Sequence, residues 1–134
     1  MSSEILFEHL VTHRKARLEA YRDEQGVLTI GYDHQGADIS EGDRITEYWA
    51  RELLRVDIAK AEVEVRKLHV TRTQGQFDTL VSIVMEVGIE EFRRSSLLRQ
   101  IRRHDRYSSL RRALRQRVAK FKGKAEWEAR RYFE

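Results

Sequence analysis

Residues 17–34, RLEAYRDEQGVLTIGYDH, are the part of the sequence that decides the fold. Two runs of β-prone residues, 18–21 and 27–32, stand on either side of a polar turn that ends in Gly26. Two short β-prone runs joined by a glycine-containing turn are typical of a β-hairpin. The sequence therefore predicts a hairpin here, with a third short strand near residues 37–39 in the loop that follows.

Helical periodicity dominates on both sides of this hairpin. Apolar residues recur with helical spacing, and capping residues mark several of the ends. The expected helices cover residues 4–15, 46–68, 73–87, 95–103, 108–121 and 125–133. The helix that begins near Thr73 is the most apolar, so it should be central. Its expected core residues are Phe77, Leu80, Val81 and Val84.

The order of elements predicts an α+β fold in a single domain over residues 1–134. A β-lobe should cover about residues 16–42, and a helical lobe should combine residues 46–134 with the first helix. On the long helix we assign Trp49 and Val56 to the buried face. On the helix over residues 108–121 we assign Val118 to that face as well.

Composition excludes several classes of protein. The chain has 134 residues, of which 40% are hydrophobic and 36% charged, which suits one modest core under a solvated surface. The absence of cysteine excludes disulfide scaffolds, thiolate metal sites and a cysteine nucleophile. The five histidines are scattered, so we expect no metal site and no cofactor.

No stretch approaches the ~20 apolar residues of a membrane span. The first residues also lack the basic region of a signal peptide. We therefore expect synthesis in the cytoplasm.

Charge is distributed unevenly along the chain. Residues 93–134 contain 15 Lys and Arg against 4 Asp and Glu, a net charge of +11, whereas residues 1–92 carry −7. A basic region of this kind indicates a polyanionic partner. The candidates are an anionic cell-wall polymer and an anionic membrane surface, contacted through the basic helices of residues 93–122. Nucleic acid is the weaker candidate, because no zinc-finger spacing, RNP string or helix-turn-helix signal is present.

Several of these segments resemble phage-type lysozymes, glycoside hydrolase family 24. Residues 17–34 resemble the family's hairpin, which reads E-G-x-R-L-x-A-Y-x-D-x-x-G-x-x-T-I-G-Y-G-H. QFDTLVS at 76–82 resembles its Q-F-D-A-L-V-S helix, and SSLLR at 95–99 resembles its S-T-L-L-R segment. RRYFE at 130–134 falls where the family carries R-R-x-x-E. The resemblance covers nearly the whole chain in the right order. It implies a muramidase fold in which a β-lobe and a helical lobe enclose a cleft for a peptidoglycan glycan strand.

The resemblance also implies positions for the catalytic groups. The family uses a Glu as general acid, together with an Asp and a Thr on the hairpin that position the attacking water. The Asp falls on Asp23 and the Thr on Thr29. The general acid should lie seven residues before Tyr21, and Arg14 occupies that position.

Further positions of the family's cleft carry over to Tyr32, Asp33, His34 and Glu86, which become the candidate substrate-binding residues. Two of these depart from the family's pattern. Asp33 stands where the family has Gly, and Glu86 stands where it has Asn or Gln. With the change at Arg14, three cleft positions therefore differ from the family together.

These departures leave three readings open. A guanidinium stays protonated, so Arg14 cannot serve as a proton donor. This favours a degenerate lysozyme that contacts peptidoglycan with little or no activity, and that would need a holin or a virion to reach the cell wall. The alternative is an active muramidase that hydrolyses the MurNAc–GlcNAc β-1,4 bond with Asp23, Thr29 and a substitute carboxylate, Glu86 or Asp33. A third reading is a binding module with a basic surface for a polyanion or a protein partner.

A cation at the general-acid position also calls for an electrostatic partner. A partly buried guanidinium without a counter-charge is costly. We therefore expect Arg14 to pair with Glu86, Asp23 or Asp33.

Overall fold

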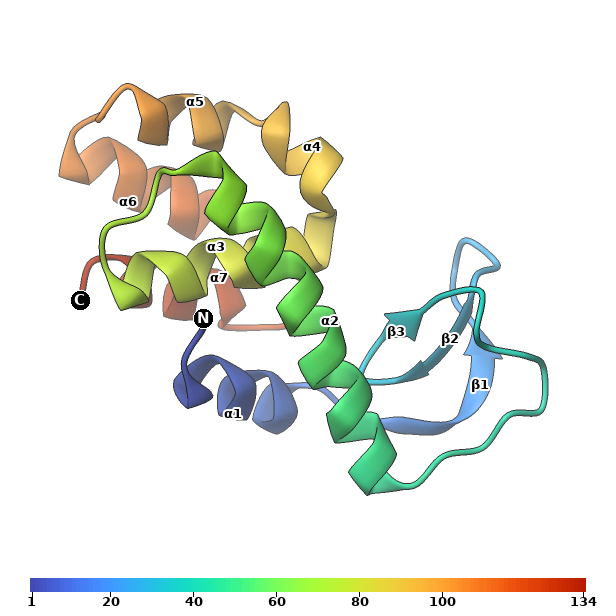
Figure 1. Ribbon diagram of the computed structural model, residues 1–134. Coiled ribbons are helices and arrows are strands. Elements are labelled where there is room, and N and C mark those ends of the chain that lie inside the picture. The colour runs from blue at the N-terminus through green and yellow to red at the C-terminus, as the bar shows by residue number, and fades with distance from the viewer. The chain divides into compact units, whose positions relative to one another are not determined.

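The computed structural model describes residues 1–134 and contains seven helices and one three-stranded sheet (Figure 1). The elements are α1 (Glu4–His13), β1 (Arg17–Arg22), β2 (Leu28–Gly31), β3 (His34–Gln35), α2 (Glu47–Leu68), α3 (Gln74–Val87), α4 (Ile89–Arg93), α5 (Ser96–Arg102), α6 (Tyr107–Gln116) and α7 (Lys124–Tyr132). The expected α+β class is confirmed. None of these helices combines the length and the apolar character that crossing a bilayer requires.

The chain forms two compact units. One consists of residues 7–59 and contains the sheet, and the other combines residues 1–6 with residues 60–134. We refer to them below as the sheet unit and the helical unit. The compact sheet unit extends beyond the loop at residue 42 and includes the first half of α2.

In the sheet unit the strands follow the order β1-β2-β3, and both pairs are antiparallel. The predicted hairpin is present, with Thr29 opposite Tyr21 on one side and opposite Gln35 on the other. The third strand was expected near residues 37–39, and this prediction is wrong, because β3 is formed by residues 34–35. The chain turns back directly after β2 through Asp33, which has a left-handed backbone with φ 63. Asp adopts this region more readily than most residues.

In the helical unit, α3 carries the core as predicted. Phe77, Leu80, Val81 and Val84 are all buried. Thr73 caps the N-terminus of α3 by accepting a hydrogen bond from the backbone N–H of Gln76.

α7 packs along α3 (Figure 1) at very close range. The Thr79 hydroxyl on α3 donates a hydrogen bond that is shared between the carbonyl oxygens of Gly75 and Glu128, at 2.8 and 3.0 Å. A Cβ atom added to Gly75 would lie 2.0 Å from the carbonyl oxygen of Arg131, so this contact between the helices requires glycine.

Several local predictions are corrected by the structure. α6 ends at Gln116 instead of continuing to residue 121, and Val118 is 93% exposed rather than buried. The short helix α4 was not predicted. On α2, Trp49 and Val56 are exposed, because they lie outside the face of the helix that is buried. That face consists of Ala50, Leu54, Ile58, Ala61, Val65 and Leu68.

Candidate functional site

Arg14 directly follows the last residue of α1, and its side chain is only 6% exposed. Its Nη1 atom lies 3.5 Å from Oδ2 of Asp33. Its Nε is buried without a hydrogen-bond partner. Among the carboxylates considered from the sequence, Asp33 therefore provides an ion pair for this cation within the sheet unit.

Asp33 also interacts with Tyr21 on β1. Burial raises the pKa of the Tyr21 phenol, and the negative charge of Asp33 and a hydrogen bond to it raise this pKa further. The phenol therefore remains a neutral hydrogen-bond donor. The Arg17 guanidinium lies 4.0 Å from the centre of the Tyr21 ring, a cation–π arrangement.

Asp23 and Thr29, the two retained hairpin positions, are linked by a third residue. The side-chain amide of Gln35 donates to Oδ2 of Asp23 at 2.7 Å and to Oγ1 of Thr29 at 3.1 Å. Sequence reasoning missed Gln35, because it placed the third strand beyond it. The pairing of Gln35 opposite Thr29 is what brings the amide to both side chains.

The remaining hydrogen bonds of Asp23 and Thr29 stabilise the turn. Oδ1 of Asp23 accepts from the backbone N–H groups of Gln25 and Val27, both at 2.9 Å. Thr29 is 1% exposed, and its hydroxyl donates to the carbonyl oxygen of Val27 at 3.0 Å. These bonds position both side chains within the hairpin.

Tyr32 and His34 are buried in the sheet unit. The Tyr32 hydroxyl donates to Glu47, and burial together with this hydrogen bond raises the pKa of the phenol. Nδ1 of His34 lies 2.8 Å from Oδ2 of Asp57, and Nε2 lies 3.3 Å from Asp38. His34 is thus held between two carboxylates.

Glu86 lies on α3 in the helical unit, where it takes part in a buried ionic network. Its Oε2 lies 2.7 Å from Nη2 of Arg117 and 3.2 Å from Nζ of Lys124. It also accepts a hydrogen bond from the backbone N–H of Lys120. Burial acts to raise the pKa of Glu86, but the charges of Lys124 and Arg117 outweigh it and hold that pKa below its usual value.

Glu128 on α7 completes this network. Its Oε1 accepts from Arg117, and its Oε2 lies 2.9 Å from Nζ of Lys124. The side chains of Lys124 and Glu128 are both fully buried. Burial lowers the pKa of Lys124, although the two neighbouring carboxylates oppose this effect. Sequence reasoning singled out Glu86 but none of its partners.

Neither unit contains a group of three or more His, Asp or Glu side chains arranged to hold a metal ion. The arrangement on the hairpin is instead a hydrogen-bonded carboxylate and hydroxyl, with an ion-paired guanidinium in the same unit. Comparison with known proteins identifies the family. A family model described as phage lysozyme matches residues 12–132. The chain belongs to the phage lysozyme family.

Individual relatives of this phage lysozyme family member are endolysins. It is 48% identical to the endolysin of Bacillus phage PZA over 71 residues. This match covers 52% of this chain and 28% of the endolysin. It is 36% identical over 90 residues to the endolysin of Salmonella phage P22, covering 63% of this chain and 62% of the endolysin. The chain thus spans less than two thirds of the length of these two relatives.

Solved structures extend the similarity to the full chain. The muramidase domain of SpmX from Asticaccaulis excentricus matches with a TM-score of 0.85 at 29% identity, covering 100% of this chain and 98% of that domain. The fold of this phage lysozyme family member is therefore lysozyme-like, as the resemblance of its sequence implied.

Proposed function

We propose that this chain is a member of glycoside hydrolase family 24 that binds peptidoglycan glycan strands and has little or no muramidase activity. The observation that carries the proposal is the state of Arg14. Its side chain is 6% exposed and paired with Asp33, at the position where the family resemblance expects the general acid. The relatives named as endolysins and as a muramidase domain support peptidoglycan as the ligand.

The loss of activity follows from the chemistry of glycoside hydrolysis. The leaving oxygen must receive a proton from a carboxylic acid whose pKa is raised. A guanidinium keeps its proton at any working pH. Loss of general acid catalysis alone costs typically about 10²–10⁴-fold in rate. A fixed cation beside a developing oxocarbenium ion would add repulsion.

The alternative of an active muramidase needs a substitute proton donor, and both candidates are poorly suited to this role. The pKa of Glu86 is lowered by Lys124 and Arg117, so this carboxyl stays ionised where an acid is required. Asp33 is engaged in the ion pair with Arg14. Asp23 and Thr29 retain their family positions. We assign Asp23 to glycan binding rather than to turnover, and the buried Thr29 to positioning Asp23 through Gln35.

The test combines binding and hydrolysis on purified peptidoglycan sacculi. We expect the unaltered protein to sediment with sacculi without lowering their turbidity or releasing reducing sugar. The variant Arg14→Glu/Asp33→Gly should gain hydrolysis, because it restores a carboxylic acid and removes its ion-pair partner. Glu86 is left unchanged in this variant, since replacing it would disturb the buried network of the helical unit.

A triple variant controls for the mechanism. Adding Asp23→Ala to Arg14→Glu/Asp33→Gly should remove the regained hydrolysis. The proposed loss of activity would be refuted if the unaltered protein lysed sacculi vigorously and the single substitution Asp23→Ala abolished this lysis. Failure to sediment with sacculi would refute peptidoglycan as the ligand.

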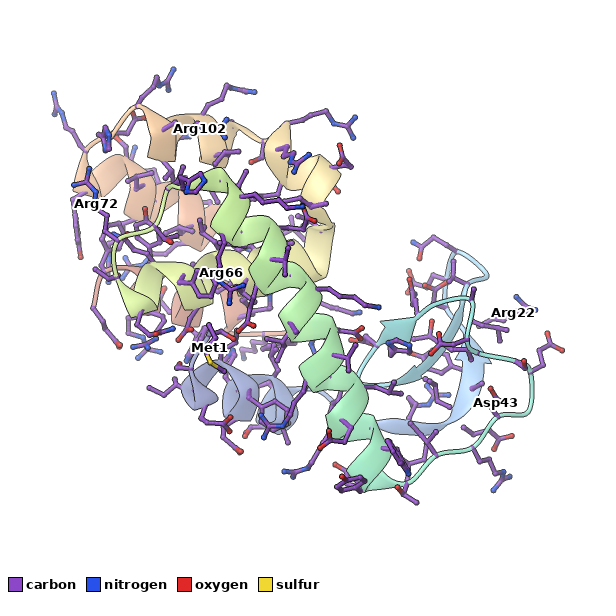
Figure 2. All side chains as sticks on the ribbon, viewed as in Figure 1. Met1, Arg22, Asp43, Arg66, Arg72 and Arg102 are labelled. Carbon is purple, nitrogen blue, oxygen red and sulfur yellow. The ribbon has the colours of Figure 1, made fainter.

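A second candidate function is adsorption to an anionic surface through the basic helices of residues 93–122. Arginine side chains project from α5 and α6, as Figure 2 shows for Arg102. Arg112 and Lys120 are exposed as well. This charge would attract anionic wall polymers or lipid headgroups at low ionic strength.

A further inference from the structure

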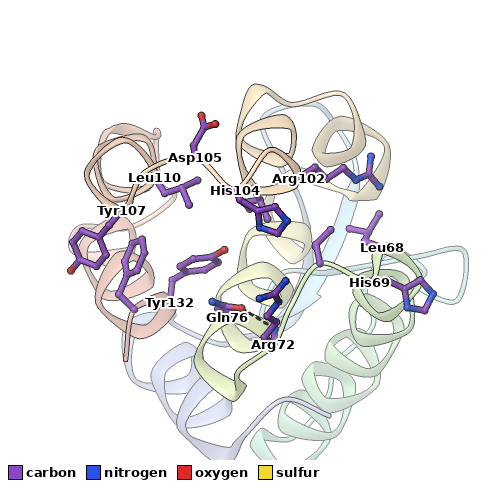
Figure 3. A pocket seen from close by; sticks show the side chains of 13 residues that line it. Leu68, His69, Arg72, Gln76, Arg102, His104, Asp105, Tyr107, Leu110 and Tyr132 are labelled. Carbon is purple, nitrogen blue, oxygen red and sulfur yellow. Dashed lines mark hydrogen bonds between the residues drawn. The ribbon is translucent and has the colours of Figure 1, made fainter.

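A cavity of about 580 Å³ opens in the helical unit, away from the residues discussed so far (Figure 3). It is bordered by the end of α2, the start of α3, the α5–α6 turn and the end of α7. Its volume lies within the range of small-molecule sites. Part of its wall is apolar and consists of Leu68, Val70, Ile101, Leu110 and Phe133.

Four polar side chains point into this cavity in Figure 3: Arg72, Gln76, His104 and Tyr132. Tyr132 is only 5% exposed, and its hydroxyl makes no hydrogen bond within the protein. Burial raises the pKa of this phenol, which keeps it protonated. The ring is buried, whereas the hydroxyl oxygen is accessible from the cavity, where a ligand can accept its hydrogen bond.

Gln76 and Arg72 also present hydrogen-bond donors to the cavity. Oε1 of Gln76 accepts a hydrogen bond from the backbone N–H of Arg72 at 2.9 Å, which leaves the amide NH₂ of Gln76 available. The Arg72 guanidinium has no carboxylate partner. The single carboxylate of the lining, Asp105, points away from the centre in Figure 3 and pairs with Arg103 at 3.5 Å.

The backbone at His104 is a further unusual feature of this cavity. His104 follows the end of α5 with a left-handed φ of 54. Helices commonly end with glycine at such a position, because a side chain is strained there. His104 nevertheless carries an imidazole, which Figure 3 shows directed into the cavity. Strain of this kind is often retained where a side chain has a function.

We propose that this cavity binds a small phosphate monoester with an apolar substituent. The phosphate would accept hydrogen bonds from Arg72, Gln76 and Tyr132, with His104 as a fourth donor. Donors that approach from several directions suit a tetrahedral oxyanion better than a planar carboxylate. The apolar substituent would lie against Ile101 and Leu110. The proposal is independent of any action on peptidoglycan.

Calorimetric titration of the full chain with phenyl phosphate tests this site. We expect saturable binding that is tighter than that of inorganic phosphate, because the phenyl ring buries apolar area. Phenol should not bind measurably. Arg72→Gln and Tyr132→Phe should each weaken binding by roughly tenfold, the effect of removing a hydrogen bond to a charged group. Arg112→Gln is the matched control, since it removes an exposed arginine outside the cavity.

Two results would overturn the proposal. One is the absence of saturable heat with phenyl phosphate. The other is an equal loss of affinity in Arg112→Gln and Arg72→Gln, which would indicate non-specific attraction to positive charge. Far-UV circular dichroism of each variant verifies that it has folded.

His104→Gly provides an independent readout. Glycine relieves the left-handed backbone, so the melting temperature should rise, whereas the affinity for phenyl phosphate should fall. A merely structural histidine would change only the melting temperature. Unchanged affinity in His104→Gly would therefore remove this residue from the site.

Discussion

Nη1 of Arg14 lies 3.5 Å from Oδ2 of Asp33, although the two residues are 19 positions apart. Arg14 precedes β1 and Asp33 follows β2, and the antiparallel pairing of these strands places Arg17 opposite Gly31. The open end of the hairpin therefore brings the two side chains together. The left-handed backbone of Asp33 belongs to the same turn.

This ion pair should contribute measurably to stability. Asp33→Asn leaves the Arg14 guanidinium with reduced compensation in a largely buried position. We expect a loss of about 1–3 kcal/mol in the free energy of unfolding, less than for a fully buried pair because Asp33 is partly exposed. Adding Arg14→Met should recover part of this loss. Urea denaturation of the two single variants and the double variant measures the coupling, and strictly additive effects would contradict it.

The network in the helical unit should be far more sensitive than a surface pair. Glu128→Gln leaves the fully buried Lys124 and its neighbour Arg117 with less negative charge, so we expect a loss of about 3–5 kcal/mol. Glu126→Gln is the matched control, since Glu126 is exposed and pairs with Arg115 at 3.1 Å. Its cost should stay below about 1 kcal/mol. Similar melting temperatures for the two variants would argue against a structural role of the network.

Glu86 should make the stability dependent on acid. Its folded pKa is lowered, so its stabilising effect is complete above the unfolded pKa of about 4.3 and is lost as the pH falls through the folded value. Glu86→Gln should therefore destabilise the protein at neutral pH, and this difference should shrink in acid. Melting curves over the acidic range measure it. Glu90→Gln, which removes an exposed partner of Arg93, should show no such pH dependence. A constant difference between Glu86→Gln and the unaltered protein would contradict the prediction.

Gly75 should tolerate no side chain. The methyl group of Gly75→Ala would collide with the carbonyl oxygen of Arg131, which belongs to the backbone of α7 and cannot move alone. We expect a loss of about 3 kcal/mol or more, at the upper end of overpacking effects. In Gly36→Ala the nearest atom is the flexible carboxylate of Asp38, so the cost should be small. Thermal denaturation compares the two, and equal costs would show that α7 yields.

The basic helices should give salt-dependent adsorption. We expect the protein to sediment with anionic phospholipid vesicles at low ionic strength and to be released as sodium chloride is added. Arg102→Glu/Arg112→Glu should bind more weakly, while Arg44→Gln in the sheet unit serves as a control. Adsorption that is independent of salt would remove electrostatics as its cause.

The sequence by itself determined the hairpin, α2, α3 and the core of α3, because each depends on local periodicity and capping. α3 begins after Thr73 as predicted, and Gly88 follows its last residue. The sequence also identified Arg14 as a cation at the expected general-acid position that needs a counter-charge. It could offer several carboxylates but not choose among them, since ion pairing depends on distances that the spacing of residues does not contain.

Only the tertiary structure decided the partners and some of the element boundaries. Gln35 reaches Asp23 and Thr29 because β3 pairs directly behind β2. α6 ends at Gln116, although its apolar pattern continues, because Arg117 leaves the helix to pair with Glu86 and Glu128, which belong to two other helices. Local propensity acts over a few residues, whereas a buried charge must find its partner wherever the fold places one.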